Sequence, residues 1–194
     1  MHNVKKVLVS LILVLSLIVG SVSVFAANES PSKLSVKDYR LAYTSTVYTG
    51  TAKKPAVYLF DANGDYIPKE YVEVTYSNNK NVGTATVNVV MYGKYSGTKT
   101  MTFNITKATP KVKTSKTASY SKLKKGAVSV GDCVTGAGAG KVTKKSGSKY
   151  LTVTSAGVVK VKKGTKKGTY KITVKVAATK NCKGVTKTIT VKVK

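Results

Sequence analysis

The protein has 194 residues, of which 34 are Lys or Arg and 7 are Asp or Glu, giving a formal net charge of +27. Its one histidine is His2, so the rest of the chain has no imidazole for acid–base catalysis or for binding a metal. This composition excludes histidine-dependent catalysis. We predict a protein that is not an enzyme, with no catalytic residues and no cofactor or metal.

Residues 1–27 have the pattern of a secretory signal peptide. Two lysines precede an almost unbroken apolar run at 7–19, and the small residues Ala26 and Ala27 provide a cleavage point. The same stretch is long enough to span a bilayer as an anchor, but the Gly–Ser break within it favours cleavage. We therefore predict a secreted protein, extracellular or associated with the cell wall, that has no membrane partner after cleavage.

The charge is distributed unevenly along the remaining chain. Residues 28–107 contain 10 basic and 6 acidic residues, whereas residues 108–194 contain 22 Lys and a single acid, Asp132. Each segment has the size of an ordinary β-sandwich domain. Pro110 follows the last apolar strand of the first segment and cannot continue a sheet ladder. We predict two domains with these boundaries, the first rich in Tyr and the second rich in Lys.

In chain order, the first domain opens with predicted strands at 32–43 and 56–60. Asn63-Gly64 then forms the strongest short hairpin signal, because both residues tolerate a positive φ. The segment around this turn also resembles the start of a calcium loop. However, Tyr66 stands where that loop needs Gly, and Val72 stands where it needs a bidentate acid. We therefore predict a plain turn.

Residues 72–105 predict three short strands separated by two polar turns. In the middle strand, apolar residues alternate with mostly polar ones: Ala85, Val87, Val89 and Met91 against Thr84, Thr86, Asn88 and Val90. Side chains of a strand point alternately to opposite faces, so each strand has one apolar face. Two sheets must bury these faces against each other, which predicts a β-sandwich.

The first domain resembles a bacterial immunoglobulin-like repeat. The resemblance rests on Tyr48-Thr49-Gly50, on the segment SNNKNVGTATV that begins at Ser77, and on the strand that follows Gly97. Such repeats occur in surface and secreted proteins of Gram-positive bacteria. The resemblance implies an extracellular sandwich that serves as a spacer or adhesive module and carries no catalytic residues.

The second domain shows the same alternation, for example in Tyr170, Ile172, Val174 and Val176. It is similar to the group-2 type of bacterial immunoglobulin-like repeat, on the residues SKLKK from Ser121 and on the strand-rich run at 146–176. Together the two domains predict an all-β fold class: two tandem Ig-like β-sandwich domains after a cleaved signal peptide.

The two cysteines of the chain, Cys133 and Cys182, both fall in the second domain. Disulfides form in secreted proteins, because the environment outside the cell is oxidising, and an even number of cysteines allows all of them to pair. The resemblance places Cys133 at the end of the second strand and Cys182 between the last two strands, at one end of the sandwich. We expect a disulfide between them; the alternative is two reduced thiols.

The lysine excess has three interpretations: a soluble surface, retention on anionic envelope polymers, or binding of nucleic acid. The second domain has only three Tyr and no Arg, so it lacks the usual base-reading residues, and we expect no specific nucleic-acid partner. We expect seven lysines to contact anionic cell-wall polymers: Lys160, Lys162, Lys163, Lys166, Lys167, Lys171 and Lys175.

Nine of the twelve Tyr residues lie in the first domain. Tyr92 and Tyr95 flank a predicted turn, where an exposed ring can stack on a sugar; packing within the core or the turn is the other role open to these tyrosines. The leading hypothesis is a secreted, non-enzymatic binding or spacer module retained on anionic wall polymers through its second domain. The alternative is an adhesin that binds a surface glycan or protein through loops of the first domain, with Tyr92 and Tyr95 as glycan contacts.

Overall fold

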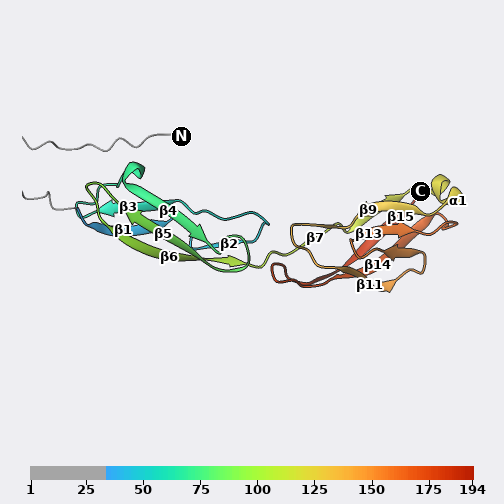
Figure 1. The fold of residues 1–194 in the computed structure, drawn as a ribbon. Helices are drawn as coiled ribbons and strands as arrows, with labels where there is room; N and C mark the ends of the chain where they lie inside the picture. Colours follow the sequence, from blue (N-terminus) through green and yellow to red (C-terminus); the bar gives the residue numbers. More distant parts are fainter. Residues whose placement is uncertain (1–33) are drawn as a thin grey trace, which may run out of the picture. The chain divides into compact units, whose positions relative to one another are not determined.

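The computed structural model describes residues 34–194, so the predicted signal peptide lies outside the described residues. Nearly all of the regular secondary structure of the described chain is strand, and it forms two tandem Ig-like β-sandwiches, which confirms the predicted fold class (Figure 1). We call them the first sandwich, with its strands between residues 36 and 106, and the second sandwich, with its strands between residues 111 and 193. Within residues 34–194, no helix is both long enough and apolar enough to cross a membrane.

The first sandwich consists of a two-stranded and a four-stranded sheet. The small sheet pairs two antiparallel strands, β1 (Val36–Leu41) and β3 (Val57–Asp61). The large sheet has the strand order β2 (Ser45–Val47), β6 (Gly97–Thr106), β5 (Gly83–Met91) and β4 (Val72–Ser77). Only β2 and β6 are parallel in this sheet. The order leaves β2 and β4 as the edge strands.

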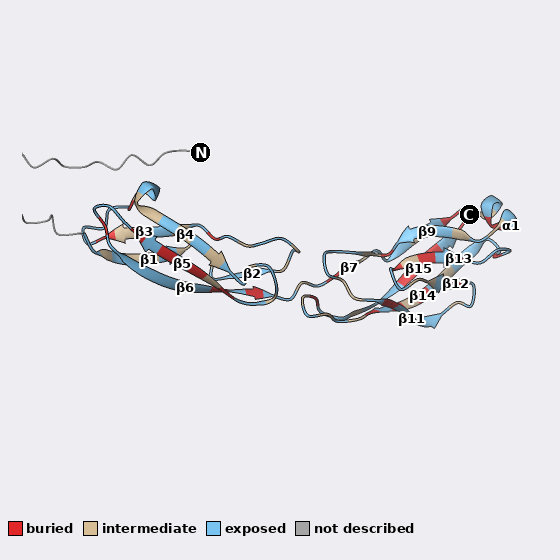
Figure 2. Cartoon of the chain, viewed as in Figure 1, coloured by how far each residue is buried: buried red, intermediate tan, exposed pale blue. Residues whose placement is uncertain are grey.

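The core of the first sandwich follows the predicted alternation. In β5 the apolar residues Ala85, Val87, Val89 and Met91 are buried, and the residues between them are more exposed (Figure 2). Phe103 of β6 and Leu59 of β3 complete the same hydrophobic cluster from the two sheets. The alternation of apolar and polar residues therefore determines which face of each strand packs into the core.

The second sandwich has a four-stranded and a three-stranded sheet. The four-stranded sheet has the order β11 (Val142–Gly147), β14 (Gly168–Val176), β15 (Val185–Val193) and β8 (Ser115–Ala118). The three-stranded sheet has the order β12 (Leu151–Val153), β13 (Val158–Val161) and β9 (Val128–Asp132). A short pair joins β7 (Lys111–Val112) to β10 (Val134–Thr135). As in the first sandwich, an early strand, β8, runs parallel to the last strand, β15.

A short helix that the sequence analysis did not predict closes the core of the second sandwich. This helix, α1 (Tyr120–Lys125), buries Leu123 completely among the side chains of the sheets. The backbone carbonyl of Leu123 also accepts a hydrogen bond from the amide of Gly164, at 3.0 Å. A single turn and a half of helix is too short to form from local propensity, so burial of Leu123 holds it in place.

The turn at Asn63-Gly64 forms, but not for the predicted reason. Only Gly64 has a positive φ, of 90°, and Asn63 does not. The turn is instead held by one carboxylate oxygen of the buried Asp61, which accepts hydrogen bonds from the amides of Asn63 and Asp65, each at 3.0 Å. The opening strand also begins later than predicted, at Val36.

Candidate functional site

The seven lysines expected to contact anionic polymers lie on three different surfaces of the second sandwich. Lys160 projects from the outer face of the three-stranded sheet, because its neighbours in β13 are buried. Lys171 and Lys175 project from the outer face of the four-stranded sheet, for the same reason in β14. The remaining four are exposed in the loop at 162–167, between these strands. Since the two sheets turn their inner faces to each other, the structure does not gather these side chains into one patch.

The positive charge of the second sandwich is not neutralised by ion pairs within residues 34–194. In residues 34–194 there is one ion pair, between Arg40 and Asp38 of the first sandwich, with Nε and Oδ2 2.6 Å apart. Some lysines instead donate to backbone carbonyls. Lys144 Nζ, for example, lies 2.6 Å from the oxygen of Ser148 and 3.0 Å from that of Leu151. Such contacts leave the full positive charge on the surface.

The two tyrosines expected to contact glycans have different environments. Tyr92 is 48% exposed in the turn between β5 and β6. Tyr95 is only 3% exposed and packs edge-on against Tyr71, with ring centroids 5.4 Å apart. Its expected role as a glycan contact is therefore not supported, because a ring inside the core has no free face for a sugar. The ammonium group of Lys94 covers this pair, 5.3 Å from each ring centroid.

The structure does not contain the expected disulfide: Cys133 and Cys182 are both free and buried. The backbone oxygen of Cys133 accepts from the amide of Lys113, whereas Cys182 pairs with Ala108. The thiol of Cys182 instead donates a hydrogen bond of 3.1 Å to the backbone oxygen of Ala137. Burial raises the pKa of the Cys133 thiol, so it is held as a neutral, unreactive thiol.

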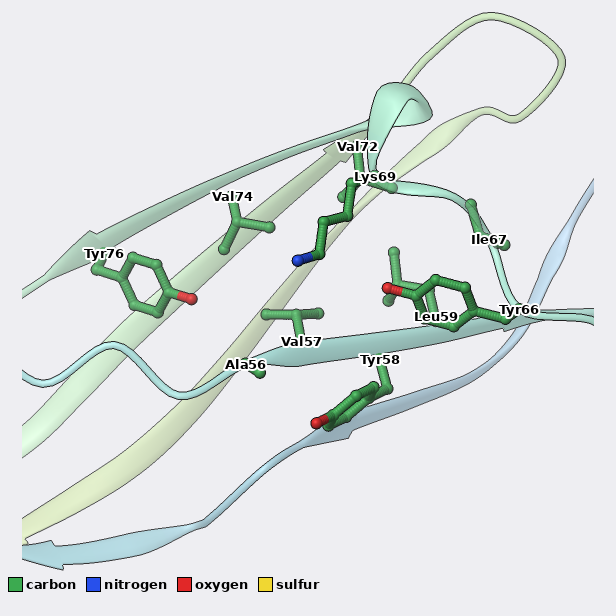
Figure 3. A pocket seen from close by; sticks show the side chains of 10 residues that line it. All are labelled: Ala56, Val57, Tyr58, Leu59, Tyr66, Ile67, Lys69, Val72, Val74 and Tyr76. Carbon is green, nitrogen blue, oxygen red and sulfur yellow. The ribbon is translucent and has the colours of Figure 1, made fainter.

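A groove of about 430 Å³ opens in the first sandwich between strands β3 and β4 (Figure 3). Most of its lining is apolar or aromatic, and it consists of Ala56, Val57, Tyr58, Leu59, Tyr66, Ile67, Lys69, Val72, Val74 and Tyr76. Tyr58 and Tyr66 are each 43% exposed. Lys69, in a 3₁₀ turn (Lys69–Tyr71) before β4, extends its side chain over the groove (Figure 3).

Tyr76 fixes one end of this groove. Its hydroxyl donates a hydrogen bond of 2.6 Å to the backbone oxygen of Pro55, which ties β4 to the segment before β3. Burial raises the pKa of the Tyr76 hydroxyl, with a smaller contribution from Tyr43. The phenol therefore stays protonated as a donor at all physiological pH values.

The sequence analysis did not identify the groove. The alternation in residues 72–77 predicts a strand with Val72, Val74 and Tyr76 on one face, and in the structure these three side chains are half-buried. No sequence pattern states which strand will lie at a sheet edge, so a local analysis could not place the groove. In residues 34–194 there is also no group of three or more metal-ligating side chains.

No family model matches the chain, and no curated protein sequence is significantly similar to it. Among solved structures, the chain is similar to Drosophila N-cadherin EC1-3, with 8% identity over 84% of this chain and 68% of that chain and a TM-score of 0.37. It is also similar to a tandem pair of Ig domains from titin, with 12% identity over 80% of this chain and 96% of that chain and a TM-score of 0.31.

A third similar structure is that of three N-terminal domains of the highly immunogenic outer capsid protein of bacteriophage RB49, with 14% identity over 84% of this chain and 70% of that chain. Its TM-score is 0.32. With TM-scores this low, these similarities carry no conclusion about function, and the assignment of two sandwiches rests on the strand pairing. The resemblance to bacterial immunoglobulin-like repeats is not confirmed by a family match.

Proposed function

We propose that this protein is a secreted, non-enzymatic binding module that is retained on anionic polymers of the cell envelope by the lysines of its second sandwich. The observation that carries the proposal is the absence of internal neutralisation. The second domain has 22 Lys against one acid, and the one ion pair within residues 34–194 lies in the first sandwich. This excess of ammonium groups is available to external anions.

The scattered placement of the lysines sets the kind of binding. Lysines on both outer faces and in the loop at 162–167 cannot all contact one rigid ligand at once. A flexible polyanion, in contrast, can wrap a surface that is positive on all sides, and a Lys ammonium group makes no strong geometric demand on a phosphate. The binding is therefore non-specific in sequence and shape, and it depends on the number of lysines rather than on their positions.

Binding to isolated bacterial cell walls tests this proposal. The purified mature chain should bind walls at low salt and be released by a few tenths molar salt, since the Debye length falls from about 10 Å at 0.1 M to about 3 Å at 1 M. Walls stripped of their phosphate polymers serve as the control and should retain little protein.

Paired charge reversals separate a diffuse surface from a defined site. Lys171→Glu with Lys175→Glu changes the four-stranded face, and Lys162→Glu with Lys163→Glu changes the loop by the same net charge. The two double variants should weaken wall binding to a similar extent. A large loss in one and none in the other, or binding that survives 1 M salt, would show a shaped site and contradict the proposal.

A further inference from the structure

Within residues 34–194, the strands at the sheet edges are protected against pairing with other chains, with one exception. Natural sheets protect exposed edges with Lys, with bulges, with very short strands or with a covering segment. Strands β1, β8 and β11 carry basic residues. The pairing of β9 with β13 contains a register shift. Strands β2, β7, β10 and β12 have three residues or fewer. The outer edge of β3 is covered in part by the amide of Ile67, which donates to Leu59 at 2.9 Å.

Strand β4 has none of these protections among the described edge strands. It is six residues long, contains no Lys, Arg or Pro, and pairs with β5 without a register shift. In a chain with 34 Lys and Arg, an edge strand without a basic residue stands out. A regular edge of this length, whose one charged residue is Glu73 on the exposed face of the strand, is a template for another strand.

The backbone groups of β4 that face outward can be identified from the ladder. The amide of Tyr92 donates to the oxygen of Tyr71 at 3.0 Å, which marks this pair as a hydrogen-bonded one. Hydrogen-bonded pairs recur at every second residue, so Glu73 and Thr75 also point their backbone groups at β5. Val74 and Tyr76 therefore point theirs at the open edge, and in residues 34–194 no other backbone group pairs with them.

The same residues line the apolar groove, which lies directly beside this edge (Figure 3). A strand added to β4 would alternate its side chains, and every second one would enter the groove. There they would meet the half-buried side chains of Val57 and Val74 and the exposed ammonium group of Lys69. Lys69 has no carboxylate partner in the described part of the chain.

We propose that the groove between β3 and β4 binds an extended peptide segment of a partner protein, which adds a strand to the edge of β4. The side chains that enter the groove are apolar, except for an acidic one beside Lys69. Main-chain hydrogen bonds to Val74 and Tyr76 provide the affinity, and the groove provides the selectivity.

Charge favours such a peptide over a second copy of the chain. Two copies would bring together two strongly positive proteins, each with a Lys69 beside its open edge, and like charges disfavour the encounter. A peptide with an acidic residue is instead attracted by the net positive charge of the chain and by Lys69 at the groove, while Glu73 lies on the opposite face of β4. This inference is independent of polymer binding, because it concerns the first sandwich and does not use the lysines of the second.

Selection from a random peptide library provides the test. Decapeptides displayed on phage are selected on the immobilised mature chain at 0.3 M salt, where diffuse charge attraction is screened. We expect enriched sequences that alternate apolar and polar positions, with an acid in the apolar row. Synthetic peptides of the enriched sequences are then titrated by fluorescence anisotropy against the chain and its variants.

Two variants probe the two parts of the proposal. In Val74→Pro, the lost amide faces the open edge, so the ladder with β5 remains and peptide affinity should fall more than tenfold. In Lys69→Glu, attraction to the acid becomes repulsion, and affinity should fall about tenfold. Lys37→Glu in β1 makes the same change of net charge on another exposed lysine and should leave affinity within twofold. Circular dichroism verifies that each variant is folded.

Three outcomes would overturn the proposal. The first is a selection in which no peptide binds the wild-type chain better than the folded Val74→Pro variant. The second is that the enriched peptides bind Lys69→Glu as tightly as wild type. The third is a wild-type dimer in sedimentation that Val74→Pro makes monomeric, because the occupant is then a second copy. Loss of wall binding in the charge reversals at 162–175 affects none of these results, so the two proposals fail separately.

Discussion

The buried leucine of α1 is expected to contribute a large share of the stability of the second sandwich. The core of this sandwich is built mostly from Val, and Leu123 is one of its few larger side chains that are fully buried. Leu→Ala substitutions at buried sites cost about 2–5 kcal/mol, because transfer energy is lost and a cavity remains. The total stability of a domain of about 90 residues is roughly 4–13 kcal/mol. We therefore expect Leu123→Ala to remove about 3 kcal/mol, which is roughly a quarter or more of that total.

Differential scanning calorimetry measures this effect. A loss of about 3 kcal/mol should lower the melting temperature of the affected transition by roughly 12–24 °C, at about 4–8 °C for each kcal/mol. Lys122→Ala is the matched control, because Lys122 lies in the same helix and is exposed. Its effect should stay within about 0.5 kcal/mol. If Leu123→Ala also changed stability by less than 1 kcal/mol, α1 would not close the core, and the reasoning would be refuted.

Three further predictions follow from buried polar groups. Burial raises the pKa of Tyr76 and of Cys133 in the folded chain. The contribution of these two groups to the free energy of unfolding is therefore complete below their unfolded pKa values, about 10 and 8.5. It is lost as the pH rises above those values. The melting temperature should fall above pH 9, and it should fall less steeply in Tyr76→Phe than in the wild type. Equal slopes of melting temperature against pH in the two proteins would contradict this. Both Cys133 and Cys182 should react with iodoacetamide only after unfolding, without reductant, as read by intact mass; a mass unchanged by alkylation under unfolding conditions would instead reveal a disulfide. Asp61→Ala should destabilise the first sandwich by about 1–3 kcal/mol in urea titration, because two amides lose their acceptor; no loss would mean that the turn does not need it.

The sequence by itself determined the all-β class, the strands of residues 72–105 and the face of each strand that became buried. These features follow from the alternation of apolar and polar residues along the strands, which a short window of sequence is enough to reveal. Ala85, Val87 and Val89 share one apolar face because they alternate with more polar residues, and that face is the buried one.

Only the tertiary structure decided the features that depend on segments far apart in the sequence. Tyr92 and Tyr95 have similar local surroundings, yet Tyr95 is buried because Tyr71 packs against it. The two cysteines are free in the fold, and each pairs its backbone with a different residue of the segment at 108–113. The groove exists because β4 came to lie at an edge of its sheet. Strand order results from how the chain crosses between sheets, and no short stretch of sequence encodes that path.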